Sequence, residues 1–309
     1  MVLFTVVLIN FAIPRLMPGN PVDIFAGGVK LTVEARQALI ERFGLDAPLW
    51  QQFCNYFINA FRGDFGVSFS YFPTPVLDVV AQALPWTLLV LGFASILQVV
   101  IGYILGVTSG WKAGSNVDSV LQTASLAVFS APVFWLGMVT LSIFGFQLGC
   151  FPLVGAQSIG IEYSSTLDQV VDIMKHAALP IIVLTIGQYA SYQLILRNTM
   201  VGVLKEQYIL TAEAKGLSEN RVKYRHAARN ALLPMVTFLA LSLSMAVGGS
   251  VYVETVFSYP GIGLLIYDSV AGRDYPVMQG CFLMFGLVVV IANFIADILY
   301  MYLDPRIRY

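Results

Sequence analysis

The chain has 309 residues, of which 58% are hydrophobic and only 11% are charged, and its mean hydropathy is +0.77. A water-soluble domain needs far more polar surface than this composition supplies. The formal net charge of −1 gives no basic excess, so nucleic acid is not an expected partner. The composition therefore indicates an integral membrane protein.

The chain opens with an apolar stretch, residues 1–16, which is short for a bilayer core that needs roughly 20 apolar residues as a helix. It lacks the basic start and the small-residue cleavage site of a signal peptide. We interpret residues 1–17 as a first transmembrane helix, either complete or trimmed at its start.

Residues 18–82 are too long for a simple connection, and we expect them to form a small folded domain. Thr32 is a suitable cap for one helix ending near Gly44, and Pro48 suits the first turn of a second helix ending at Gly63. The second helix carries an aromatic stripe of Trp50, Phe53, Phe57 and Phe61. The stripe indicates packing against the protein or in the membrane interface, and direct substrate contact is the alternative.

Five longer apolar stretches follow, and none shows the period-two alternation of a strand. They cover residues 83–110, 120–149, 176–196, 233–257 and 277–303. The predicted fold is all-α and integral to the membrane, with six transmembrane helices. Five of them form a core over residues 83–303, followed by a tail at 304–309.

The distribution of Lys and Arg predicts the orientation. Residues 197–232 carry seven basic and three acidic side chains, whereas residues 18–82 carry four basic and six acidic ones. We therefore expect the 197–232 loop and both termini to be cytoplasmic and residues 18–82 to lie outside. Cys54 and Cys150 then share the outer side, so a bridge between them is open, although three scattered cysteines are more typical of unrelated thiols. No metal site is predicted.

The cytoplasmic loop shows two short helical patterns. The first runs from Gln207 to a stop at Gly216, and the second begins after Ser218 and repeats Arg221, Arg225 and Arg229 on one face. The alternative is a solvated linker whose arginines face lipid phosphates.

This loop resembles a known signature. The pattern Tyr208-x-x-Thr211-Ala212-x-Ala214-Lys215-Gly216-Leu217-Ser218, followed by His226-Ala227-x-Arg229-Asn230-x-Leu232-Leu233-Pro234, is similar to the coupling loop of binding-protein-dependent ABC importer permeases, in the dipeptide/oligopeptide/nickel branch. Further similar segments are Arg15-Leu16-x-Pro18-Gly19-x-Pro21, Gly63-Asp64-Phe65-Gly66-x-Ser68, Phe257-Ser258-Tyr259-Pro260-Gly261 and Asp304-Pro305-Arg306. The chain has Leu210-Thr211-Ala212 where the wider superfamily has Glu-Ala-Ala.

The resemblance implies the type I ABC importer permease fold, of the first-permease type with an outer domain between spans 1 and 2, in a prokaryotic cell membrane. It implies four partners besides membrane lipid: a paralogous second permease, two ABC ATPase subunits and an extracytoplasmic solute-binding protein. The sequence has no Gly-rich loop ending in Gly-Lys-Ser/Thr, so we expect no cofactor in this subunit, and ATP and Mg to be used by the ATPase partners. Di- and oligopeptides are the expected substrates, with nickel chelates and oligosaccharides as alternatives.

Three groups of candidate site residues follow. The resemblance implies that a short rigid element couples this chain to the ATPase. Its residues are Glu206, Tyr208, Thr211, Ala212, Glu213, Ala214, Lys215, Gly216, Leu217 and Ser218. Polar groups inside spans are costly and therefore candidates for the pathway, here Gln188, Tyr189, Tyr192, Gln193 and Glu254, with interhelical hydrogen bonding as the alternative. The external gate or binding-protein contact is assigned to Tyr259, Pro260, Arg273 and Asp274, the alternative being a local Arg273–Asp274 ion pair that closes the last hairpin.

Two other classes of membrane protein fit the sequence less well. A secondary transporter is expected to carry ionisable residues at mid-bilayer and matching interrupted helices in two halves. An intramembrane protease needs a catalytic motif such as His-Glu-x-x-His, which the sequence lacks.

Overall fold

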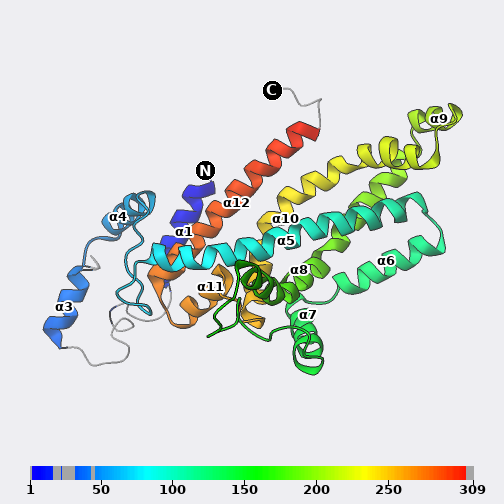
Figure 1. The fold of residues 1–309 in the computed structure, drawn as a ribbon. Helices are drawn as coiled ribbons and strands as arrows, with labels where there is room; N and C mark the ends of the chain where they lie inside the picture. Colours follow the sequence, from blue (N-terminus) through cyan, green and yellow to red (C-terminus); the bar gives the residue numbers. More distant parts are fainter. Residues whose placement is uncertain (1, 17–21, 23–31, 43–45, 304–309) are drawn as a thin grey trace. The chain divides into compact units, whose positions relative to one another are not determined.

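The computed structural model describes residues 2–16, 22, 32–42 and 46–303, and regular structure over these residues is helical. The chain divides into two compact units, Met1–Thr87 with Pro260–Val288, and Leu88–Tyr259 with Val289–Tyr309 (Figure 1). The all-α prediction is confirmed over the described residues.

The first unit brings the start of the chain together with the segment before the last span. Its helices are α1 (Val2–Leu16), α3 (Val33–Arg42), α4 (Leu49–Phe61), the start of α5 (Val76–Trp111), α11 (Ile262–Ala271) and the start of α12 (Tyr275–Leu303). The second unit contains the rest of α5 and α12 with α6 (Asn116–Phe129), α7 (Val133–Thr140), η1 (Leu141–Gln147), α8 (Thr166–Val203), α9 (Gln207–Ala214), η2 (Arg221–Ala228) and α10 (Arg229–Val256).

Three of the described helices are long and apolar enough to cross a membrane, namely α5, α8 and α12. The number rises to five if each of two bent pairs forms one span. In one pair α6 meets α7–η1 at 93°, and in the other α10 bends by 62° between Leu243 and Gly248. α1 has 15 residues, fewer than a full span needs.

The prediction of one continuous helix over residues 120–149 is wrong. The helix breaks between Phe129 and Val133, and Pro132 stands at the cap position of α7 with extended backbone angles. Proline has no N–H to donate and its ring clashes with the preceding turn, which explains the break. Ser130 closes the end of α6 by donating its hydroxyl to the Ala127 carbonyl.

The two predicted helices of the 18–82 segment are confirmed as α3 and α4. Thr32 accepts the first backbone bond of α3 and Pro48 caps α4, while the end predicted at Gly44 lies outside the described residues. Gly63 follows α4 with φ +75°, the left-handed conformation that glycine adopts most readily. Phe53 and Phe57 of the aromatic stripe contact Phe4 of α1 edge-on, with ring centroids 6.4 and 6.2 Å away.

A row of glycines lets α5 approach α8 closely. An added Cβ at Gly106 would lie 2.9 Å from the Cβ of Leu196, and one at Gly110 would lie 2.5 Å from the Cβ of Met200. Gly102 faces Tyr192 in the same way. Spaced four residues apart, the three glycines lie on one face of α5, an arrangement that brings backbones together in membrane helices.

Candidate coupling site and pathway residues

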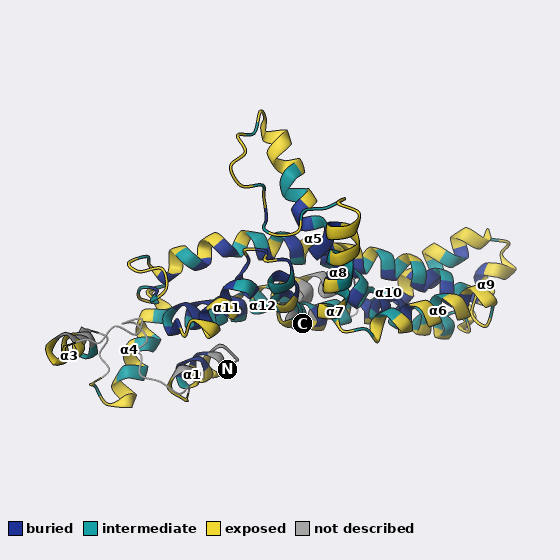
Figure 2. Cartoon of the chain, turned by 90° about the horizontal axis from the view of Figure 1, so that it is seen from below, coloured by how far each residue is buried: buried dark blue, intermediate teal, exposed yellow. Residues whose placement is uncertain are grey.

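α9 is a short, mostly exposed helix that stands at one end of the second unit (Figures 1 and 2). Its exposed residues are Gln207, Tyr208, Leu210, Thr211, Glu213 and Ala214. Ile209 and Ala212 point the other way and are buried, at 1% and 5% exposure. Of the predicted coupling residues on α9, only Ala212 points inward, and with Ile209, which was not among them, it forms a buried anchor.

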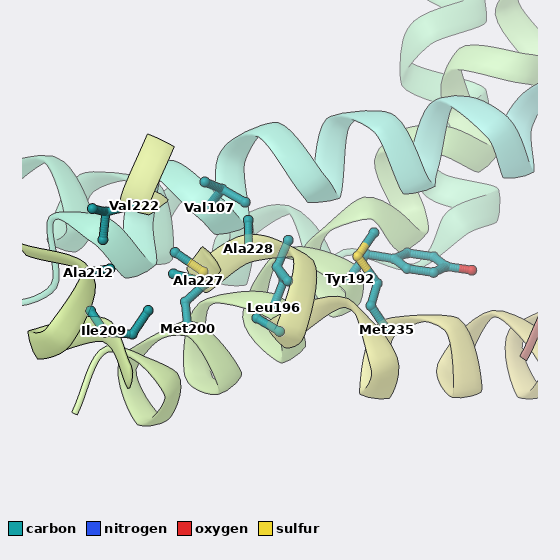
Figure 3. Close-up of a cluster of buried hydrophobic side chains, with 11 residues drawn as sticks. Val107, Tyr192, Leu196, Met200, Ile209, Ala212, Val222, Ala227, Ala228 and Met235 are labelled. Carbon is teal, nitrogen blue, oxygen red and sulfur yellow. The ribbon is translucent and has the colours of Figure 1, made fainter. Parts of the chain in front are cut away.

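The anchor belongs to a buried apolar cluster that joins α9 to the long helices (Figure 3). Leu196 and Met200 of α8 and Val222 of η2 pack with Ile209, while Val107 contributes from α5. Leu217 is half-buried against the same cluster. Because burying a large aliphatic side chain contributes about 1.5–3 kcal/mol, the cluster fixes α9 to the helices beneath it.

The turn after α9 depends on Gly216. Its φ is +72°, and its N–H donates to the Glu213 carbonyl at 2.8 Å, while the N–H of Leu217 donates to the Ala212 carbonyl. This pattern satisfies the last carbonyls of the helix. An added Cβ would meet nothing within 4 Å, so the need for glycine is conformational.

Two side-chain hydrogen bonds tie the loop to neighbouring helices. The Trp111 Nε1–H at the end of α5 donates to Glu219 Oε1 at 2.8 Å, and the Asn230 amide of α10 donates to the Tyr208 hydroxyl at 3.1 Å. Helical structure resumes at Glu219, after Ser218 has accepted the N–H groups of Arg221 and Val222. The loop that contains α9 is therefore hydrogen-bonded directly to α5 and α10.

Asp118 forms a buried charge site that sequence reasoning missed. Its carboxylate, in a side chain that is only 2% exposed, receives Arg197 Nη2 at 2.7 Å and Nε at 3.2 Å. It also accepts from the Ser109 hydroxyl and from the Gly114 N–H. The group links the end of α5, the start of α6 and α8. No short-range motif joins Asp118 to Arg197, which lie 79 residues apart.

Among the predicted pathway residues, Tyr192 and Gln193 are fully buried between helices of the second unit. The Tyr192 hydroxyl is hydrogen-bonded to Ser242 of α10, and Gln193 Oε1 accepts from Ser125 of α6. Gln188 and Tyr189 lie on the same helix but are only half-buried. The stripe thus separates into two fully buried residues that bond neighbouring helices and two half-buried ones, of which Tyr189 accepts from the Ser125 hydroxyl at 3.5 Å.

Glu254 is buried at 0% exposure near the end of α10, and its backbone carbonyl accepts the Tyr259 N–H at 2.8 Å. Burial raises the pKa of Tyr259, and the nearby Glu254 carboxylate raises it further. Tyr259 belongs to the second unit, whereas Pro260, Arg273 and Asp274 belong to the first. The gate candidates therefore fall in different units.

Of the two charged gate candidates, only Arg273 is exposed. Asp274 is 1% exposed, and its carboxylate accepts from the Ser68 hydroxyl, the Ser70 N–H and the Val277 N–H. Arg273 has φ +55°, an uncommon value for a side-chain-bearing residue. The segment between the two groups of candidates is not a plain turn but contains α11, whose first N–H donates to Thr87 Oγ1 at 2.7 Å.

An open apolar groove of about 480 Å³ lies between α7–η1 and α10, lined by Met138, Leu141, Ser142, Phe146, Leu153 and Val256. Within the described ranges, no three His, Cys, Asp or Glu side chains gather to hold a metal ion. Cys54 and Cys150 are both exposed thiols that form no bridge.

Several helices that are long and apolar enough to cross a membrane indicate a multi-pass membrane protein. Residues 98–309 match the family model of the binding-protein-dependent transport system inner membrane component, and the chain belongs to that family. It is 36% identical to the oligopeptide transport system permease protein AppB of Bacillus subtilis (strain 168), over 100% of this chain and 96% of the relative.

Two further relatives have the same extent of similarity. The di/tripeptide transport system permease protein DppB of Pseudomonas aeruginosa (strain UCBPP-PA14) is 36% identical, over 99% of this chain and 95% of its own length. The glutathione transport system permease protein GsiC of Escherichia coli (strain K12) is 35% identical over the same shares. The predicted family is confirmed.

Proposed function

We propose that this chain is the permease subunit of an ATP-driven importer that takes up di- and oligopeptides delivered by an external solute-binding protein. The support comes from full-length similarity to permease proteins of peptide systems. In this proposal the chain lies in a prokaryotic cell membrane with both termini in the cytoplasm, lines half of the pathway and pairs with a paralogous permease.

ATP hydrolysis belongs to two partner ATPase subunits in this proposal, because the sequence has no phosphate-binding loop. The exposed face of α9, with Tyr208, Thr211 and Glu213, docks in a groove on one ATPase. The single observation that carries this role is the division of α9 into an exposed face and the buried anchor of Ile209 and Ala212. A push on the exposed face then moves α8 and α10 as rigid bodies, which is the usual form of a ligand-driven switch.

The pathway itself is assigned to the half-buried polar residues Gln188 and Tyr189 of α8. Tyr192 and Gln193 support them from the buried side of the same helix through their bonds to α10 and α6. Uncharged polar side chains suit a pathway that passes varied peptides and leaves selection to the binding protein. Nickel chelates and oligosaccharides are the alternative substrates.

The function is tested by reconstituting the complete transporter in vesicles and measuring ATP-dependent uptake of a labelled tripeptide, a nickel chelate and an oligosaccharide. We expect uptake of the tripeptide only, dependent on the binding protein and abolished by vanadate. Uptake of the nickel chelate or the oligosaccharide without the tripeptide would reject the substrate class. Uptake driven by an ion gradient without ATP would reject the transporter class.

A further inference from the structure

α4 differs from an ordinary helix of a water-exposed domain. Residues 47–61 contain no charged side chain, and the run is flanked by Asp46 and Arg62. None of the residues of α4 is buried, yet the helix carries large apolar side chains in the open: Leu49, Trp50, Ile58 and Phe61 are 66%, 69%, 48% and 71% exposed. Exposed apolar surface of this extent indicates contact with a partner or with lipid.

The side chains of α4 sort into three edges. Phe53, Tyr56 and Phe57 face α1, where Phe53 and Tyr56 lie 5.2 and 5.8 Å from the Phe11 ring. Trp50, Cys54, Ile58 and Phe61 recur every three or four residues on a second, apolar edge. Gln51, Asn55 and Asn59 recur every four residues on a third, polar edge. At about 100° per residue the polar edge faces away from α1, and the apolar edge lies between the polar edge and the edge that meets α1.

Hydrogen bonds within the first unit set the level of α4 relative to α12. The Asn10 amide of α1 donates to the Gln279 carbonyl at 2.7 Å and to the Tyr56 hydroxyl at 3.1 Å, and Gln279 Nε2 donates back to the Asn10 carbonyl at 3.1 Å. Tyr56 therefore stands level with Gln279. The apolar span of α12 begins at Tyr275, so this level is about 6 Å into the span at 1.5 Å per residue.

That depth is the one at which amphipathic helices lie in a membrane surface, roughly 5–10 Å into the boundary of headgroups and acyl chains. In Figure 1 α1 is drawn along its length while α4, beside it, is seen nearly end-on, so the two helices cross. Near the C-terminal end of α1, the guanidinium group of Arg15 donates to Gln52 Oε1 at 2.8 Å and stacks on the Phe11 ring. The guanidinium Cζ lies 3.5 Å from the centroid of the Phe11 ring, which is a cation–π contact.

We propose that α4 is an interfacial helix that lies in the surface of the lipid bilayer, with the edge of Trp50, Cys54, Ile58 and Phe61 against lipid acyl chains and the edge of Gln51, Asn55 and Asn59 toward water. The occupant of the apolar edge is lipid because the edge lies at the depth of the α12 span and continues the exposed apolar surface of α1, where Phe4 and Ile9 are 53% and 51% exposed. The proposal rests on membership of a membrane family and not on the substrate.

The natural cysteine on the apolar edge provides the test. With Cys150→Ser to remove the other exposed thiol, a nitroxide spin label on Cys54 reports the apolar edge of the whole transporter in phosphatidylcholine/phosphatidylglycerol vesicles. The matched control is Cys54→Ser/Cys150→Ser/Asn55→Cys, one residue along on the polar edge. Collision with oxygen, which is enriched in lipid, is compared with collision with the water-soluble complex Ni-EDDA.

We expect the oxygen to Ni-EDDA collision ratio to be several-fold higher at Cys54 than at Asn55→Cys. An Ile58→Cys label in the cysteine-replaced chain repeats the measurement if the label at position 54 disturbs the helix, and the same high ratio is expected there. Equal, water-like ratios at both edges would overturn the proposal by placing α4 in solvent. Protection of Cys54 and Ile58→Cys from both reagents would overturn it by showing that a protein partner covers the edge.

Discussion

Ser68 donates its hydroxyl to the buried carboxylate of Asp274 at 2.5 Å, across 206 residues of sequence. The contact joins the loop before α5 to the turn before α12, and the Ser70 N–H adds a second bond to the same carboxylate at 2.8 Å. A charged group that receives several hydrogen bonds in a buried position organises the loops around it.

Replacing Asp274 with alanine is therefore expected to destabilise the first unit. The change leaves the buried Ser68 hydroxyl and the Val277 N–H without their acceptor, and an unsatisfied buried donor costs about 1–3 kcal/mol. Thermal unfolding in detergent is expected to show a lower midpoint for Asp274→Ala. The neighbouring Arg273→Ala is the control, because Arg273 is exposed, and an equal loss there would contradict this reading.

The assignment of Arg273 to the external gate or binding-protein contact makes a separate prediction. Its side chain is exposed, so Arg273→Ala is expected to lower the stimulation of ATPase activity by the solute-binding protein while leaving the amount of folded protein unchanged. Basal ATPase activity of the reconstituted complex is the internal reference. Unchanged stimulation would show that the segment is only a connection between spans.

Gly216→Val is expected to uncouple ATP hydrolysis from transport. A β-branched residue disfavours φ +72° by about 1–2 kcal/mol, which shifts the turn after α9 although nothing blocks the side chain itself. Uptake per ATP hydrolysed, measured in vesicles, is expected to fall in the order Gly216, Gly216→Asn, Gly216→Val, since asparagine tolerates this conformation. If Gly216→Val takes up as much substrate per ATP hydrolysed as the unchanged protein, the turn has no role in coupling. Loss of the protein from the membrane would show that Gly216 is needed for folding instead.

Arg197→Ala is expected to cost about 3–5 kcal/mol of stability, because it leaves the Asp118 carboxylate buried without its partner. The double variant Asp118→Asn/Arg197→Gln removes both charges and is expected to recover most of the loss. Thermal midpoints of the two variants in detergent distinguish a paired charge from a packing role. A double variant no more stable than Arg197→Ala would favour packing.

The predicted orientation is tested with cysteines at two exposed positions, Arg62→Cys and Arg225→Cys, in a chain without other cysteines. A membrane-impermeant maleimide added to intact cells is expected to label position 62 and not position 225, because basic residues concentrate in the cytoplasmic loop. Labelling of both sites in broken cells controls for reactivity. The opposite pattern would reverse the topology.

Local sequence signals predicted the helices they govern. Pro48 and Gly63 bound α4 as expected, and Gly216 ends the coupling helix in the left-handed conformation that its position suggested. These features depend on one or two residues and their immediate backbone, so no tertiary information is required.

Features that depend on distant partners were not predicted. Asp274 was assigned to the external gate or binding-protein contact but is buried, because its hydrogen-bond partners Ser68 and Ser70 come from a distant part of the chain. The break before α7 was overlooked within an apolar stretch, although Pro132 was the signal that marks it. Hydropathy measures length and apolarity and is insensitive to such a bend.

The row of Gly102, Gly106 and Gly110 on α5 has a consequence at the level of the gene. Every single-base change that alters the amino acid at a glycine codon introduces a Cβ or a stop, and at these three positions a Cβ would lie within 3.0 Å of α8. A saturation mutagenesis screen is therefore expected to find three intolerant codons spaced four apart. Gly92, where an added Cβ meets nothing within 4 Å, has no such steric constraint.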